Sequence, residues 1–313
     1  MTCSTLGSRR QSAGGWALLV ALAMALPLAG DATGGHGSVV WASDQRVCAL
    51  LLLCAGGMLS GLLAGLLGIG GALVTIPVLH LTLPSLGIHA GLVPATAVAT
   101  ALMAMVPITL AAAWRQHRHG AIANAWLRRM ALPTAVGATC GALLAATLNG
   151  PVLMLSFALQ SCWYGARLLL DRGGIDPRAD GGSVWRRLAQ LPPWLAAPPM
   201  AAFCACVGMG GGSMITPFLL RKRVPFRRAA ATAGALNLCI SLAGSLVFVL
   251  SSADASRATA CVPAALLLAA GAMVSVKLGV SIAHRVPVVL LQRLIGIVNV
   301  VSATTLLCQV ALH

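Results

Sequence analysis

Two short glycine-rich stretches carry the residue types best suited to binding a ligand. One runs from Gly68 to Pro77 and reads GIGGALVTIP, and the other runs from Gly208 to Pro217 and reads GMGGGSMITP. Each glycine destabilises a helix by about 1 kcal/mol, so we expect a helix to break at both stretches and a short second helix to follow. The backbone N–H groups at the start of such a helix bind anions without a cationic side chain.

The predicted anion site combines these glycines and prolines with nearby hydroxyl and amide side chains. The candidate substrate-binding residues are Gly68, Gly70, Gly71, Thr75, Pro77, Thr96, Gly208, Gly210, Gly211, Gly212, Ser213, Thr216, Pro217, Thr232 and Asn237. Hydroxyl groups would donate hydrogen bonds to the anion, and an amide in the middle of a span needs a partner or water. The alternative is structural: glycines also permit close helix packing, and a membrane Ser or Thr often bonds to its own helix.

The two stretches are related by a constant spacing. Gly68, Gly70, Gly71 and Pro77 align with Gly208, Gly210, Gly211 and Pro217 without a gap, since 208 − 68 and 217 − 77 both equal 140. An Ala-Thr-Ala motif at 95–97 recurs at 231–233, with an offset of 136. This pattern indicates an internal duplication. Paired interruptions at matching positions of two halves are typical of a transporter's binding site.

The composition is that of a helical membrane protein. Of 313 residues, 58% are hydrophobic and 9% are charged, and the mean hydropathy is +0.90, which excludes an ordinary soluble domain. The net charge of +15 comes from arginines between apolar segments, a pattern that favours positive-inside loops over nucleic-acid binding. The ten cysteines lie mostly in apolar segments and are interpreted as small packing residues. No spacing indicates a metal site or a cofactor, and we expect none.

Carboxylates are missing from the apolar segments. The acidic residues are Asp31, Asp44, Asp171, Asp176, Asp180 and Asp254. All lie outside the predicted spans, so the chain has no conventional acidic site for a coupling proton or sodium ion. His80 and His89 lie on or just after the first short helix and are the candidates for a coupling proton. For both, an interfacial structural role is the alternative that we favour.

Apolar segment lengths predict two repeats of similar order. Residues 1–46 form an N-terminal segment, interpreted either as a signal peptide or as a first transmembrane helix at 16–29 followed by an outer loop. The first repeat, 47–170, has spans at 47–67, 90–114, 130–148 and 152–170, with a short helix at 72–83. A cytoplasmic linker, 171–193, follows. The second repeat, 194–313, has a segment at 194–207, a short helix at 213–220, and spans at 229–250, 260–283 and 288–310.

Lysine and arginine placement predicts opposite orientations for the two repeats. The rich loops are those around 115–129, 172–187 and 221–228, and these are assigned to the cytoplasm. The first broken helix then begins and ends outside, whereas the second begins and ends inside. The predicted fold is therefore all-α: a polytopic transmembrane bundle of two inverted repeats, each with a glycine-rich broken or re-entrant helix.

The repeated glycine turn followed by proline resembles the sulfite exporter TauE/SafE family, over about residues 47–309. The first copy departs from the family's triple glycine at Ala72, where the second copy has Gly212. The resemblance implies movement of sulfite, a sulfonate or another organosulfur anion across the bacterial inner membrane. We therefore predict a secondary transporter that works by alternating access and binds a small anion within the lipid bilayer. The alternative is a membrane scaffold without transport activity; an enzyme is disfavoured because no acid, base or metal set is visible.

Overall fold

The computed structural model describes residues 40–67, 71–86, 88, 90–170, 190–251 and 255–283, together with residues 293, 296–297, 299–301, 303–304 and 307. The predicted N-terminal signal or helix at 16–29 lies outside the described residues. So do Gly68 and Gly70 of the first glycine stretch, His89, and residues 171–189 of the predicted linker.

All regular secondary structure in the described part of the chain is helical. The long helices are α2 (Val40–Leu67), α4 (Val93–Arg118), α5 (Asn124–Thr147), α6 (Gly150–Leu170), α10 (Phe226–Ser251) and α11 (Ala255–Ala283). The shorter ones are α3 (Ala72–Thr82), α8 (Pro193–Val207) and α9 (Gly212–Arg221), with single 3₁₀ turns η2 (Pro84–Leu86) and η3 (Ala90–Leu92). Five of them, α2, α4, α5, α10 and α11, are long and apolar enough to cross a membrane. The protein is therefore a multi-pass, all-helical membrane protein.

Glycine conformation explains where helices end at the two glycine-rich stretches. Gly208 follows α8 with φ 76°, a left-handed conformation that costs glycine little. Its N–H donates to Ala205 O at 3.2 Å, and the N–H of Met209 donates to Cys204 O at 2.8 Å, which is the Schellman pattern of a helix C-terminus. Gly71, with φ 73°, precedes α3 in the same left-handed region. The second stretch interrupts helical structure between α8 and α9, and Gly71 of the first stretch lies outside the helix directly before α3.

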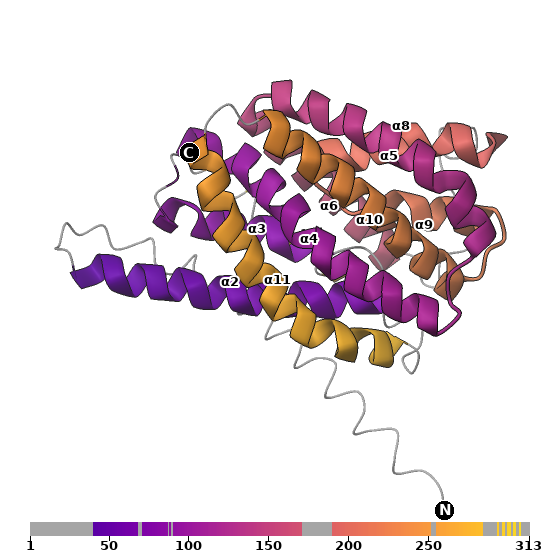
Figure 1. Cartoon of the computed structure of the whole chain (residues 1–313), viewed down its shortest axis with the longest axis horizontal. Coiled ribbons are helices and arrows are strands. Elements are labelled where there is room, and N and C mark those ends of the chain that lie inside the picture. The colour runs from indigo at the N-terminus through magenta and orange to yellow at the C-terminus, as the bar shows by residue number, and fades with distance from the viewer. Residues whose placement is uncertain are drawn as a thin grey trace, which may run out of the picture.

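Two helix pairs form the opposite sides of the bundle (Figure 1): α2 packs along α11, and α5 packs along α8. A β-carbon on Gly57 would overlap the carbonyl group of Leu268, and one on Gly61 would overlap that of Ala272. Gly137 and Gly141 of α5 meet Pro198 and Ala202 of α8 in the same way. In each pair, the residue numbers of the contacting positions increase together along the two helices. The two helices of each pair therefore run in the same direction. Glycine permits these close approaches between backbones.

Helices α4 and α10 lie between these pairs and contact each other in the middle of the bundle (Figure 1). The Oγ atoms of Thr109 and Ser241 lie 3.4 Å apart, and Leu102 lies against Gly244. The residue numbers of the contacting positions increase along α4 while they decrease along α10. The two helices therefore run in opposite directions. They are also the most buried of the five long apolar helices. All five helices expose some large apolar side chains, as expected of surfaces that face lipid.

Candidate functional site

The second glycine break forms a buried turn between α8 and α9. Residues 208–211 connect the end of α8 to α9, and all four are buried. Ile215 N–H donates to Gly211 O at 2.8 Å, which starts the ten-residue helix α9. Because the N-terminus of α9 lies inside the protein, its backbone N–H groups and the positive end of its dipole are directed at protein interior rather than water.

Asn237 of α10 is bonded directly to this break. Its Oδ1 accepts the N–H of Gly211 at 2.9 Å, and its side chain is fully buried. The amide's other half, Nδ2, has no hydrogen-bond partner among the described residues. Since both atoms belong to one planar amide, Nδ2 is a donor held at the break. A buried donor without a partner is costly, which makes this group a strong candidate for binding a ligand or water.

Thr216 supplies a hydroxyl group in the first half of α9. Its side chain is 3% exposed, and its Oγ1 has no hydrogen-bond partner within the described chain. Most membrane threonines bond to the carbonyl four residues earlier in their helix. The hydroxyl of Ser213 does bond locally, donating to Gly210 O at 3.2 Å. Asn237 and the first half of α9 therefore carry two buried polar groups that no described residue satisfies.

Hydroxyl groups connect the start of α3, just after the first break, to α2. The Thr75 hydroxyl lies 3.1 Å from each of its two acceptors, Ser60 Oγ of α2 and Gly71 O. A β-carbon on Gly71 would overlap Ser60 Oγ, so glycine is needed there for space as well as for its φ of 73°. Ser60 thus ties the start of α3 to α2.

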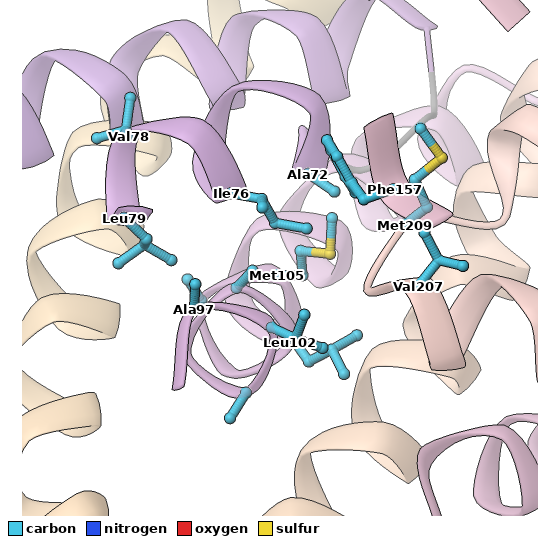
Figure 2. Packing of buried hydrophobic residues seen from close by; sticks show 14 of the residues in the cluster. Ala72, Ile76, Val78, Leu79, Ala97, Leu102, Met105, Phe157, Val207 and Met209 are labelled. Carbon is cyan, nitrogen blue, oxygen red and sulfur yellow. The ribbon is translucent and has the colours of Figure 1, made fainter. Parts of the chain in front are cut away.

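The second break lies against α3 and α4. A β-carbon on Gly208 would come within 3.1 Å of Ile76 Cδ1 in α3 and 3.0 Å of Val98 Cγ1 in α4. Figure 2 shows Val207 and Met209 beside the segment that carries Ala72 and Ile76, within one buried apolar cluster. Phe157 of α6 lies beside Met209 in the same cluster.

Other predicted site residues occupy different places. Pro77 and Pro217 are buried inside α3 and α9, and Gly212 is the first residue of α9. Thr96 is buried in α4, where its carbonyl accepts the Thr100 hydroxyl at 2.7 Å. Thr232 is bonded elsewhere: its hydroxyl accepts the N–H of Ala123, just before α5, at 3.0 Å and donates to Arg228 O at 2.7 Å.

Sequence reasoning missed Ser60 and Phe157, which lie at the breaks. Ser60 is a small polar residue within an apolar segment, and Phe157 is an aromatic residue within a predicted span. Neither belongs to a motif or a repeat, so no signal in the sequence could have selected them.

The segments that build the breaks carry no formal charge. Residues 47–114, 191–220 and 229–250 contain no Lys, Arg, Asp or Glu. Within the described residues, no group of three or more His, Cys, Asp or Glu side chains could hold a metal ion. The arrangement offers neutral hydrogen-bond donors at a helix N-terminus, which is a way to bind an anion.

Comparison with known proteins identifies the family. The family model described as Sulfite exporter TauE/SafE matches residues 53–306, a region that contains both breaks and most of every described helix. The chain belongs to the TauE/SafE family. It is therefore a membrane transporter with several apolar helices, and the resemblance predicted from the repeated glycine turn is confirmed.

The TauE/SafE chain is also similar to a probable membrane transporter protein of Haemophilus influenzae. The two are 25% identical over 250 residues, which cover 78% of this chain and 92% of the relative. No solved structure matches the chain.

Proposed function

We propose that this TauE/SafE protein is a secondary transporter that moves sulfite, a sulfonate or another small organosulfur anion across the inner membrane by alternating access. The observation that carries the proposal is the Asn237 amide, buried and bonded to Gly211 at the start of α9, with Nδ2 left as a donor. An anion at the breaks would accept from this donor and from the N-terminus of α9. No enzymatic step enters the proposal.

Helix directions support an inverted repeat. In the proposed division, residues 47–170 and 194–313 are the two halves, joined by a cytoplasmic linker at 171–193. Helices α4 and α10 then correspond to each other, and they run in opposite directions, as the Thr109–Ser241 and Leu102–Gly244 contacts require. Repeats related by an axis along the membrane normal would make them run in the same direction, whereas an axis in the membrane plane reverses one.

Helix pairing supports the same symmetry. The first helix of each half, α2 or α8, packs against the helix of the other half, α11 or α5, that follows the central span. Within each pair the two helices run in the same direction and pack through glycine contacts. In this proposal each pair is a rigid unit, because side chains that would separate the backbones are absent. The two breaks act as re-entrant elements between these units.

Alternating access follows from this arrangement. The contact between Gly208 and Ile76 joins the second break to α3. Rocking of the α2–α11 pair against the α5–α8 pair, about the crossing of α4 and α10, would open the breaks first to one side and then to the other. The bound anion would remain near the crossing in both states.

The test is uptake of radiolabelled sulfite and of methanesulfonate into proteoliposomes that contain the purified protein. Saturable uptake of either compound is expected, and an imposed pH gradient distinguishes proton coupling from uniport or exchange. Saturation and counterflow distinguish a carrier from a channel. Absence of flux for both compounds, together with co-purification of a protein complex, would overturn the proposal in favour of a membrane scaffold.

A further inference from the structure

The described residues around the two breaks differ in which polar groups are left without a hydrogen-bond partner. At the first break, the Thr75 hydroxyl is bonded to Ser60 and Gly71. At the second, Asn237 Nδ2 and Thr216 Oγ1 have no partner within the described chain. With the offset of 136 that relates α4 to α10, Asn237 corresponds to residue 101, because 237 − 136 = 101, and that residue is alanine. The first half therefore has no amide at the matching position.

We propose that the second break alone binds the transported anion, and that its neutral donors select an oxoanion with a single negative charge. The inference rests on the proposed function and narrows its site and its substrate class. The first break then serves as a structural element, in which Ser60 and Thr75 fix the start of α3. Asn237, Thr216 and the N-terminus of α9 are the binding groups.

The selection of a single charge follows from the absence of a cation. Transfer of an ion from water into a protein interior is costly unless opposite charge or hydrogen bonds replace its hydration. A helix N-terminus provides about half a positive charge, and two neutral donors add partial charge only. The partial positive charges of these groups can stabilise one negative charge. They are too small to replace the hydration of a doubly charged oxoanion.

Sulfite itself can meet this requirement. It exists near neutral pH as a mixture of the doubly charged ion and the singly charged hydrogensulfite ion, which carries one proton. If hydrogensulfite is the bound form, the proton crosses the membrane on the substrate. The protein then needs no intramembrane carboxylate, and its predicted spans contain none.

Few groups of the protein near this site can titrate. Cys204 and Cys206 lie on α8, Cys239 lies on α10, and His80 lies on α3; α4 contributes none where it contacts the breaks. Titration of any of these groups would change uptake of every substrate. Titration of the substrate would change uptake of sulfite alone. Methanesulfonate keeps one negative charge at all physiological pH values, so it separates the two cases.

The first experiment compares variants in reconstituted vesicles. Thr216→Val keeps the shape of the side chain but removes the donor, and Asn237→Asp keeps the acceptor for Gly211 N–H while replacing Nδ2. Both should raise the KM for sulfite about tenfold or more, the range expected when a hydrogen bond to a charged group is lost. Ser60→Ala removes a hydroxyl from the first break and should leave KM unchanged. A normal elution profile in detergent shows that each variant is folded.

The second experiment measures wild-type initial uptake against external pH at constant total concentration. Sulfite uptake should rise as pH falls, in proportion to hydrogensulfite, while methanesulfonate uptake stays constant and sulfate does not compete. The inference is overturned if sulfite uptake follows the doubly charged ion, if both substrates change together, or if Thr216→Val and Asn237→Asp keep the wild-type KM. Wild-type protein that moves no anion at all would instead overturn the proposed function.

Discussion

Gly208 lies against Ile76: a β-carbon on Gly208 would come within 3.1 Å of the Ile76 Cδ1 atom. The two residues belong to different glycine stretches and are far apart in the sequence. Their contact brings the end of α8 against the short helix α3. A side chain added at the second break must therefore be accommodated by α3, since the packed interior leaves no free space there.

Replacement of Gly208 by alanine should destabilise the protein through strain and crowding. The left-handed φ of 76° costs a non-glycine residue about 1 kcal/mol or more. The new β-carbon would also press on Ile76 and Val98. We expect a lower thermal unfolding temperature in detergent, measured by loss of the monodisperse elution peak after heating.

Gly120→Ala is the matched control for this prediction. Gly120 has a φ of 63°, but a β-carbon there would meet no atom within 4 Å. The substitution adds strain without crowding and should lower the unfolding temperature less than Gly208→Ala does. Equal losses in the two variants would show that the contact with Ile76 contributes nothing.

The glycines between α5 and α8 should be intolerant of larger side chains. A β-carbon on Gly141 would overlap the backbone of Ala202, which cannot rotate away as a side chain can. Gly141→Val should therefore destabilise the protein by about 1–3 kcal/mol, the usual cost of overpacking. Thermal unfolding measures the effect, with Gly91→Val as control because a β-carbon there meets nothing within 4 Å. Similar unfolding temperatures for both variants would contradict the close packing of these helices.

Cysteine pairs can test the crossing of α4 and α10. The Oγ atoms of Thr109 and Ser241 are 3.4 Å apart. In a variant without the ten native cysteines, Thr109→Cys with Ser241→Cys should form a disulfide on mild oxidation. A protease site inserted within 171–189 allows the halves to separate on a denaturing gel unless they are cross-linked.

The control pair for this cross-link is Thr109→Cys with Ser245→Cys. Ser245 lies one turn further along α10, away from Thr109 if the helices run in opposite directions. The control should cross-link more slowly. Faster cross-linking of the control pair would mean that α4 and α10 do not cross as described.

Opposite orientation of the two halves predicts the accessibility of their connections. Single cysteines at Asn149, between α5 and α6, and at Lys222, after α9, should react from opposite sides of the membrane. A membrane-impermeant maleimide applied to cells with a permeabilised outer membrane should label position 149 only. After the inner membrane is disrupted, both should react. Labelling of position 222 before disruption would contradict the proposed inverted repeat.

Helices and their interruptions were predictable because local composition determines them. Long apolar segments are helical in a membrane, and clustered glycines end helices by their own backbone preferences. Predicted boundaries were shorter than the observed ones at polar ends. Helix α5 begins at Asn124 rather than 130, and α4 continues to Arg118 rather than 114. Hydropathy counts apolar residues, whereas a helix continues into the headgroup region, where Trp and Arg are favourable.

Contacts at the candidate site were only partly predictable. Asn237 could be selected from its place in a span, but its bond to Gly211 depends on how α10 packs against α9. The same packing directs Thr232, selected by the repeat, to Ala123 instead of the break. Ser60 had no signal at all, although it connects the start of α3 to α2 through Thr75. Pairing across helices is set by tertiary packing, which a single sequence does not display.

The most direct test of an anion site at the glycine breaks is counterflow of labelled sulfite in proteoliposomes that contain Gly210→Leu. Gly210 is buried between α8 and α9, so a leucine side chain would fill the break. Gly91→Leu is the matched control, because its position is exposed and open. We predict normal counterflow for the control and none for Gly210→Leu, with both proteins inserted at wild-type abundance. Normal counterflow by Gly210→Leu would contradict an anion site at this break.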